Sequence, residues 1–249
     1  MDFKKVAAAV VAVGLSSIAP RVAHADRRAF GFTYEYNTMP EGGVDLELWN
    51  TQSRASFPGG PANLDWKMEV EYGVTDHWDL AVYQTFGQTH GAGGSDALGY
   101  QETSLESRYR FAERGEWPVD VLVYLEVAKG FGTGLGDVEP KIILAKDLGQ
   151  VSLNLNLISE IELTREASGD LELEWVPGWS FGAAYELSPQ WKLGAETFGE
   201  IEDEEAIASI GPSVSWAPNE KIWVAGTVAA GLTDEASDLT ARFIIGLGL

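Results

Sequence analysis

Hydrophobic and polar residues alternate along most of this chain, and the pattern is clearest at residues 64–72, LDWKMEVEY. Its even-numbered positions are apolar, and the odd-numbered positions between them are charged. The stretch 73–77 is short and rich in turn-forming residues, and the alternation restarts at Trp78. Alternation with a period of two is typical of a β-strand with one apolar and one polar face. The region therefore predicts an antiparallel hairpin with a tight turn.

The same pattern recurs to the end of the chain. It predicts strands at residues 44–54, 64–72, 78–88, 101–112, 119–129, 138–148, 151–163, 171–187, 191–202, 206–217, 221–232 and 239–249. Short turns and longer loops alternate between them. The short turns are 74–77, 149–150, 188–190 and 218–220, and the longer loops are 88–100, 130–137, 164–170 and 233–238. Outer-membrane barrels have this asymmetry between their two ends, and an even number of strands.

Charged residues are nearly absent from the apolar positions of the clear strands, which suits a surface that faces lipid. A charge on the lipid face of a barrel costs about 2–4 kcal/mol at the membrane midplane. Aromatic residues gather near the short turns, where barrels carry a girdle at the membrane interface. The predicted interface aromatics are Tyr72, Trp78, Tyr109, Phe111, Tyr185, Trp191 and Trp216. We predict an all-β, transmembrane, antiparallel up-and-down β-barrel of about twelve strands; a secreted soluble β protein is the alternative.

The two ends of the chain agree with export to an outer membrane. Residues 1–25 combine two lysines, a short apolar run and an Ala-His-Ala site, which is typical of a cleaved secretory signal peptide. Residues 26–43 would then be a periplasmic or luminal segment, and 44–249 the barrel. Within that segment, 30–37 alternates aromatic with small or polar residues; it is expected in the lumen or under the barrel rather than paired at the closure. The alternating end at 239–249 suits recognition by the barrel-insertion machinery.

Composition narrows the choice of function. The formal net charge is −21, so the chain is not expected to bind nucleic acid. There is no cysteine, which excludes disulfides, a thiol nucleophile and a cysteine-based metal site. Expected partners are outer-membrane lipid and lipopolysaccharide, the insertion machinery and small-molecule solutes. No cofactor is expected.

The polar face of the strands is the most informative surface, because in a barrel it lines the interior. Two interpretations stay open: a polar, salt-bridged interior, or a wet acidic channel that favours cations. The predicted pore-lining residues are Asp45, Glu47, Asp65, Lys67, Glu69, Glu71, Glu102, Glu106, Arg108, Arg110, Glu126, Glu139, Lys141, Glu160, Glu162, Glu172, Glu174, Lys192, Glu196 and Glu200.

Catalytic candidates are few. His77 is expected in a solvated turn, and His90 in a loop at the opposite end, near Ser95 and Asp96. A surface lipid hydrolase or protease centred on His90 is conceivable, but the spacing matches no known signature. Two histidines outside the signal peptide make a transition-metal site unexpected. The glycines of 130–137 lack the lysine and helix of a phosphate-binding loop. We therefore predict no catalytic, cofactor-binding or metal-binding residues.

The hairpin at residues 72–80, YGVTDHWDL, resembles the YG-x-T-D strand-turn-strand of a large class of bacterial barrels. That class includes the outer-membrane proteins assigned to the phenol meta-cleavage pathway. Residues 39–49 are similar to the opening of those proteins. The resemblance implies an outer-membrane barrel in a Gram-negative bacterium and uptake of aromatic or hydrophobic compounds. Together with the acidic inner face, it favours a narrow channel or passive transporter for small solutes over a closed structural or adhesive barrel.

Overall fold

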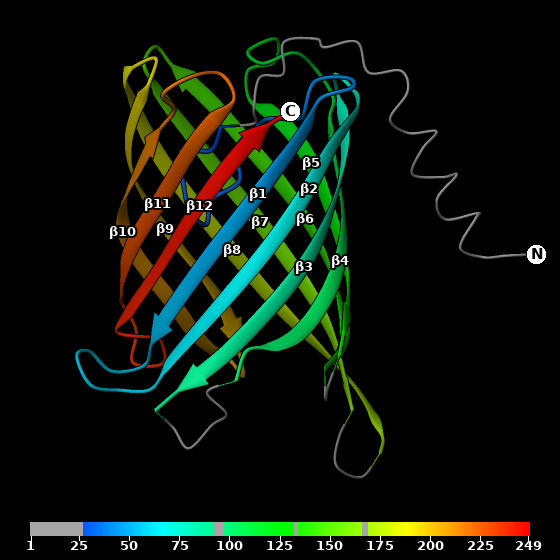
Figure 1. The fold of residues 1–249 in the computed structure, drawn as a ribbon, viewed down its shortest axis with the longest axis vertical. Helices are drawn as coiled ribbons and strands as arrows, with labels where there is room; N and C mark the ends of the chain where they lie inside the picture. The colour runs from blue at the N-terminus through cyan, green and yellow to red at the C-terminus, as the bar shows by residue number, and fades with distance from the viewer. Residues whose placement is uncertain (1–26, 92–96, 132–133, 166–168) are drawn as a thin grey trace, which may run out of the picture.

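The strands of this protein form one closed antiparallel barrel (Figure 1). The structure, a computed structural model, describes residues 27–249 except 92–96, 132–133 and 166–168. Each strand pairs with its neighbours in the chain, and β1 pairs with β12 to close the barrel. The predicted twelve-strand antiparallel barrel is therefore confirmed. The proposed signal peptide lies outside the described residues.

The strands match the predicted segments closely. They are β1 (Val44–Arg54), β2 (Ala62–Thr75), β3 (Trp78–His90), β4 (Gly99–Arg110), β5 (Asp120–Gly130), β6 (Gly134–Leu148), β7 (Val151–Arg165), β8 (Leu171–Ser188), β9 (Trp191–Glu202), β10 (Glu205–Trp216), β11 (Ile222–Gly231) and β12 (Leu239–Gly248). The largest difference is at β6, which begins at Gly134 rather than at 138, because its pairing with β7 continues into the loop; β2 extends beyond its predicted bounds at both ends. No helix in the described part of the chain is long and apolar enough to cross a membrane.

The barrel has an apolar outer surface and a polar interior. In β4, Leu105 is 53% exposed, whereas its neighbours Ser104 and Glu106 are at most 1% exposed. The same alternation runs through the other strands, so that exposed leucine, valine and isoleucine side chains ring the outside. A soluble protein buries such residues, so this arrangement is the inverse of a water-soluble fold and is typical of a barrel that meets lipid.

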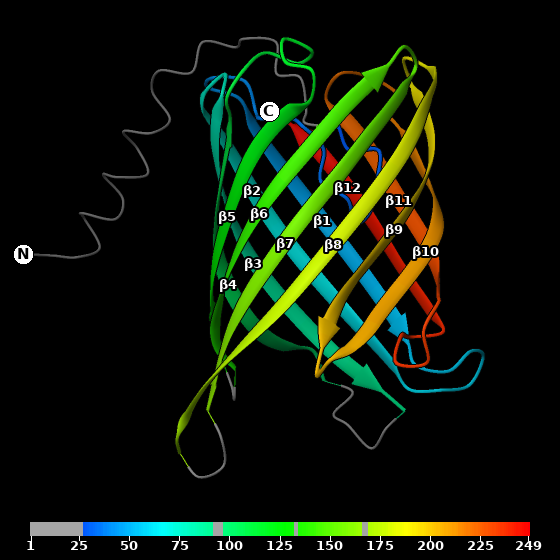
Figure 2. The same cartoon turned by 180° about the vertical axis from the view of Figure 1, so that it is seen from behind.

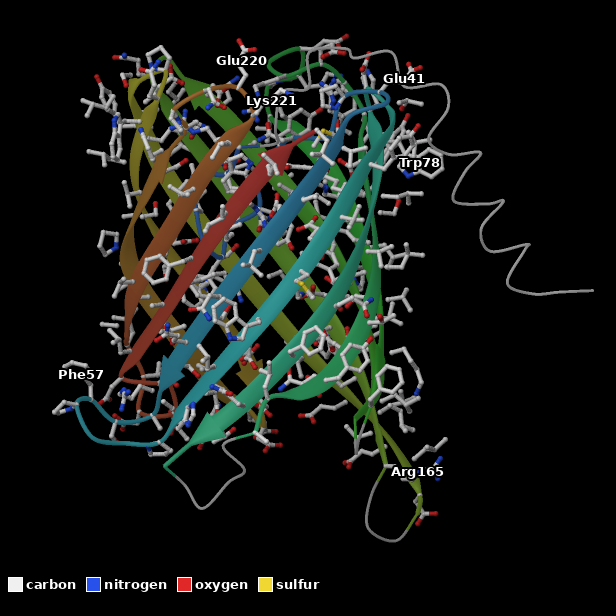
Figure 3. The ribbon with its side chains drawn as sticks, viewed as in Figure 1. Glu41, Phe57, Trp78, Arg165, Glu220 and Lys221 are labelled. Atoms are coloured by element: carbon white, nitrogen blue, oxygen red, sulfur yellow. The ribbon has the colours of Figure 1, made fainter. Side chains whose placement is uncertain are left out.

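The two ends of the barrel differ. At the short-turn end lie the connections 76–77, 149–150, 189–190 and 217–221, together with the C-terminus, as Figure 2 shows from behind. Most longer connections lie at the opposite, long-loop end. Figure 3 shows Glu41, Trp78 and Glu220 at the short-turn end, and Phe57 and Arg165 at the long-loop end.

The difference in loop length is not uniform. The β4–β5 connection, 111–119, is long although it lies at the short-turn end, and the β9–β10 connection at the long-loop end is the two-residue turn 203–204. Asp203 and Glu204 both have positive φ, as such a tight hairpin turn requires. Loop 111–119 is long because it lies across the mouth of the barrel and contacts the chain inside it, as described below.

Residues 27–43, called here the N-terminal segment, are drawn in blue in Figures 1 and 2 and lie inside the barrel except near Glu41, which is exposed at the rim (Figure 3). They form no strand. Phe30, Tyr34, Tyr36 and Met39 are all buried. Residues 30–37 alternate like those of a strand, but their side chains pack against different parts of the barrel wall. Most of the segment therefore lies in the lumen.

Candidate functional site

The pore-lining candidates lie on strand positions that face the interior, with one exception. Nine are buried: Asp45, Glu47, Glu69, Glu71, Glu106, Arg108, Glu126, Lys141 and Glu196. Ten are half-buried: Asp65, Lys67, Glu102, Arg110, Glu139, Glu160, Glu162, Glu174, Lys192 and Glu200. Glu172 is exposed and pairs with Thr164 in the β7–β8 hairpin. Figure 2 shows this hairpin extending beyond the other strands, so Glu172 does not line the interior.

The N-terminal segment is bound to the barrel wall chiefly through Glu196 of β9. Its carboxylate accepts hydrogen bonds from the backbone N–H groups of Gly31 (2.8 Å), Phe32 (3.0 Å) and Thr33 (2.7 Å). The hydroxyl of Thr227 donates to the same carboxylate. Consecutive N–H groups that converge on one anion form a strong and directional contact. Glu196 is thus an anchor for the segment rather than a free charge in a channel.

Asn156 of β7 makes a second backbone contact. Its side-chain oxygen accepts from the N–H of Tyr34 at 2.7 Å, and its amide nitrogen donates to the carbonyl of Tyr34 at 3.0 Å. Ser180 holds the orientation of the amide through a bond of 2.9 Å to the same oxygen. Asn156 therefore pairs with the segment as a strand would, although the segment is not part of the sheet.

Aromatic rings of the segment form a layer with rings of the barrel wall. Phe32 stacks on Phe198 of β9 with 3.9 Å between ring centroids, and Tyr34 packs against Tyr124 of β5 at 5.0 Å. Phe30 fills the space left by two glycines, because a Cβ at Gly182 would lie 2.7 Å from its ring. These contacts fill part of the lumen at this level with apolar side chains.

Arg28 places a positive charge within this layer. Its guanidinium lies 4.0 Å from the ring centroid of Tyr34 and 4.5 Å from that of Trp49. Burial disfavours the charged form, but the influence of Tyr34, Glu47 and Glu69 outweighs it and raises the pKa of Arg28 above its usual value. The guanidinium thus stays charged and offsets part of the carboxylate excess on β1 and β2.

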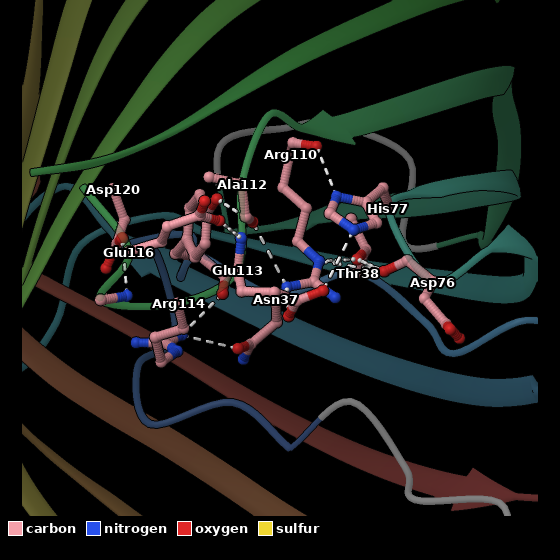
Figure 4. A network of polar contacts seen from close by, with 12 residues as sticks. Asn37, Thr38, Asp76, His77, Arg110, Ala112, Glu113, Arg114, Glu116 and Asp120 are labelled. Carbon is pink, nitrogen blue, oxygen red and sulfur yellow. Dashed lines mark hydrogen bonds and ion pairs between the residues drawn. The ribbon is translucent and has the colours of Figure 1, made fainter.

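The end of the segment is tied to the rim, as Figure 4 shows. Thr38 donates to the carbonyl of Asp76 at 2.8 Å, and Arg110 donates to Thr38 at 3.0 Å. Arg110 also pairs with Glu113 at 2.8 Å, and the ring of His77 lies 3.1 Å from Glu113. The hydrogen bond and the charge of Arg110 lower the pKa of the Glu113 carboxyl. Candidate residue Arg110 is therefore a rim contact.

Loop 111–119 covers the same mouth. The hydroxyl of Tyr36 donates to the carbonyl of Ala112 at 2.7 Å, and Arg114 donates to the carbonyl of Tyr36 at 2.6 Å. Arg114 also contacts Asn37 and Asp147, at 2.7 and 3.2 Å. Desolvation of the Tyr36 hydroxyl raises its pKa. The N-terminal segment and this loop together narrow the short-turn end.

Three buried carboxylates come together on β1 and β2: Glu47, Glu69 and Glu71 offer oxygens that lie within 4.8 Å of one another. Sequence analysis placed no metal site here. Glu71 forms an ion pair with Arg108, and Glu47 accepts from the indole of Trp49 at 2.7 Å. With the guanidiniums of Arg28 and Arg108 nearby, this group is part of a mixed-charge interior.

A cavity of about 390 Å³ lies on the long-loop side of the aromatic layer. Its lining includes Phe32, Tyr34 and Trp49, together with residues near the long-loop ends of β9, β10 and β12. It carries cations and carboxylates together. Its charged lining residues are Lys67, Glu126, Glu139, Lys141, Glu200 and Arg242. We call it the luminal cavity.

Sequence analysis missed several residues of this site. Arg242 could have been predicted to face the interior, because it shares the inward parity of β12 with Thr240 and Ile244. Phe198 likewise sits at an inward position between Glu196 and Glu200. Arg28 could not have been predicted, since it precedes the alternating residues 30–37 and belongs to no predicted strand.

Two histidines, His77 and His90, lie in the described part of the chain. The Nδ1 atom of His77 lies 3.0 Å from the carbonyl oxygen of Arg110. His90 ends β3, is exposed, and lies 2.8 Å from the amide of Gln88. Ser95 and Asp96 lie outside the described residues, so the hydrolase hypothesis centred on His90 stays untested.

The predicted interface aromatics all face outward at the short-turn end, each 37–49% exposed. Trp191 stacks on Trp216 with 5.8 Å between centroids. A second group that the sequence analysis did not identify lies toward the long-loop end, where Tyr100 contacts Phe86 at 5.2 Å and Phe131 at 5.0 Å. Exposed aromatic side chains therefore occur toward both ends of the barrel.

Comparison with known proteins supports the fold and leaves function open. A family of unknown function, DUF6662, matches residues 22–115, which is less than half of the chain. No curated protein matches. The COG4313 outer-membrane channel from Pseudomonas putida F1 has a similar structure, with 14% identity, a TM-score of 0.67, and coverage of 86% of this chain and 98% of that one.

Two porins have the same fold. The NanC porin has 10% identity and a TM-score of 0.59, with 82% of this chain and 100% of that one covered. The KdgM porin has 7% identity and a TM-score of 0.57, with 82% and 97% covered. At these identities the likeness concerns the fold alone. The resemblance to the phenol meta-pathway barrels is not confirmed by these matches.

Proposed function

We propose that this protein is an outer-membrane channel or passive transporter for small solutes. The observation that carries the proposal is a closed barrel with an apolar exterior, whose polar interior contains the luminal cavity. The structurally similar proteins are described as an outer-membrane channel and porins, which supports the same role. Location in the outer membrane of a Gram-negative bacterium, after removal of a signal peptide, belongs to this proposal.

We further propose that the channel prefers cations. The interior carries many more carboxylates than basic side chains, and several of the carboxylates are half-buried near the long-loop end. Rings of carboxylates favour cations in channels. The alternative preference for aromatic or hydrophobic compounds rests on the sequence resemblance alone.

A second candidate is a closed structural or adhesive barrel, and the N-terminal segment favours it. The segment and loop 111–119 close much of the short-turn end. Hydrolysis at His90 is a third and weaker candidate; it predicts that His90→Ala abolishes lipid or peptide turnover.

Single-channel recording in planar bilayers with a KCl gradient tests the first two candidates. We expect discrete conductance steps with a cation-selective reversal potential. A variant lacking residues 27–40 should conduct more than the full chain, because the aromatic layer is then incomplete. If neither protein conducts although both are folded and heat-modifiable, the channel proposal is wrong; if only the shortened protein conducts, the closed barrel is the better description.

A further inference from the structure

The luminal cavity has unlike charges on opposite sides. Its lining includes Arg242 of β12 and Lys67 of β2 on one side, and Glu139 of β6 and Glu200 of β9 on the other. In the closed strand order, β12, β1 and β2 are neighbours; β6 lies six strands from β12, and β9 lies three strands from it. The cavity lining therefore places two cations on β12 and β2, and carboxylates on β6 and β9 with Lys141 beside Glu139.

The positive charge of Arg242 is not neutralised by a close carboxylate. Its guanidinium donates to the hydroxyl of Thr51 at 2.8 Å and lies 4.2 Å from the ring centroid of Phe32. Asp65 and Glu196 are within electrostatic reach. Among the described residues, however, no carboxylate lies within ion-pair distance of Arg242. An arginine held by rings and a hydroxyl keeps donors available for an anionic group.

Lys67 adds to this positive side. Its ammonium lies 3.7 Å from Glu126, a long ion pair, and 4.6 Å from the ring centroid of Tyr83. A carboxylate entering from the long-loop end would meet both Lys67 and Arg242. Two cations side by side bind an anion more strongly than either does alone.

The opposite side is acidic: Glu139 and Glu200 line the cavity, and Asp137, Glu160 and Glu162 lie close to them. We call these five residues the acidic wall. Asp137 pairs with Glu162 across β6 and β7, and Glu162 pairs with Glu174 across β7 and β8. Glu139 forms an ion pair with Lys141 at 2.8 Å. In the described part of the chain the other four carboxylates of the wall form no ion pair. Among the described residues, Lys141 is the cation that pairs with this wall, at Glu139.

We propose that the luminal cavity binds small zwitterions, with their carboxylate at Arg242 and Lys67 and their ammonium at the acidic wall. A simple cation is attracted by the acidic wall and repelled by Arg242. A simple anion is attracted by Arg242 and repelled by the acidic wall. Only a solute that carries both charges gains on both sides. The rings of Phe32, Trp49 and Phe198 supply apolar contact for the spacer between the charges. This inference names a solute class for the proposed transport function and rests on it.

Isothermal titration calorimetry on the purified full-length barrel, in detergent micelles, tests the proposal without requiring transport. The probes are ε-aminocaproate, the shorter γ-aminobutyrate, and the mono-ions caproate and hexylammonium. We expect at least one zwitterion to bind about tenfold more tightly than either mono-ion. The better of the two zwitterions indicates the separation of the charged sides.

Substitutions assign each end of the ligand. Glu200→Gln should reduce zwitterion affinity toward that of caproate and leave caproate binding unchanged. Arg242→Gln should reduce it toward that of hexylammonium. Because Arg242 also donates to the carbonyl of Gly31 at 3.3 Å, Lys67→Gln is the second test of the basic side and should act in the same direction. Glu220→Gln, at the short-turn end (Figure 3), is the matched control and should change nothing.

Three results would overturn the proposal: no binding of any probe, equal binding of zwitterions and mono-ions, or a preference that survives both Glu200→Gln and Lys67→Gln. Bilayer recordings separate this inference from the transport function. If the barrel binds zwitterions but never conducts, the binding inference stands and the channel proposal is wrong. If the barrel conducts but shows no preference for zwitterions, the channel proposal stands and the binding inference is wrong.

Discussion

Glu196→Ala should release the N-terminal segment from the barrel wall. The substitution removes the acceptor of three consecutive backbone N–H groups. Gly31 keeps a partner, since its N–H also lies 3.1 Å from the hydroxyl of Thr227. The N–H groups of Phe32 and Thr33 lose theirs. A buried donor left without an acceptor costs about 1–3 kcal/mol, so docking of the segment should weaken by about 2–6 kcal/mol.

That free energy corresponds to a shift of about thirtyfold to ten-thousandfold in the ratio of docked to undocked segment. Hydrogen exchange followed by mass spectrometry measures it directly, because amides 31–33 exchange only when the segment leaves Glu196. We expect faster exchange in peptides covering 27–43 and unchanged exchange in the strands. In planar bilayers, the open probability should rise in parallel.

Two comparisons make the test decisive. Glu172→Ala, on the projecting β7–β8 hairpin, removes a carboxylate from an exposed position and should leave exchange at 27–43 unaltered. Glu196→Gln keeps an acceptor but loses the charge, so its effect should lie between those of wild type and alanine. If exchange of amides 31–33 is the same in Glu196→Ala as in wild type, Glu196 does not hold the segment and the reasoning fails.

The remaining predictions concern the wall and the rim. Leu125→Arg, at the middle of the outer face of β5, should lower the free energy of unfolding by about 2–4 kcal/mol in a urea titration in lipid. The same change at Leu187, at the end of β8, should lower it by only about 0–1 kcal/mol. Equal effects at the two positions would argue against a lipid-facing belt. Gly73→Ala places a Cβ 2.0 Å from a carbonyl oxygen of the N-terminal segment and should raise the protease sensitivity of that segment, while Gly59→Ala, whose Cβ meets nothing within 4 Å, should not. Because the pKa of Glu113 is lowered, its carboxylate contributes to stability above the unfolded-state pKa of 4.5, and this contribution is lost as pH falls through the folded-state pKa. The difference in melting temperature between wild type and Glu113→Gln should therefore shrink on acidification. A constant difference would contradict this.

Much of the fold could be predicted because the alternation within each strand shows which of its side chains face inward and which face outward. Alternation with a period of two identifies a strand and assigns every side chain to one face, so that Glu47 and Leu48 could be placed inside and outside without any knowledge of their neighbours. Barrel closure then follows from an even number of strands and an apolar outer face. The strand ends were less certain where pairing continues into the loops, as at β6.

The site was harder to predict because its contacts join distant parts of the chain. Residues 30–37 alternate like a strand, yet their partners are Glu196 and Asn156, and nothing local indicates this pairing. The length of loop 111–119 was visible, but its contact with Tyr36 depends on where the segment lies. The role of Glu196 also differs from that of other inward carboxylates, and parity alone treats them as equal.

The path of the N-terminal segment has a mechanical consequence. At one end, Arg27 donates to the carbonyls of Pro189 and Gln190 in the β8–β9 turn, at 2.6 and 2.9 Å. At the other end, the N–H of Gly42 donates to the carbonyl of Gly73 in β2 at 2.8 Å. These attachment points lie nearly half-way round the rim from each other in the strand order. The segment thus links two nearly opposite points of the rim, and we expect it to resist flattening of the barrel. Because the segment forms no strand, it can detach without opening a strand pair.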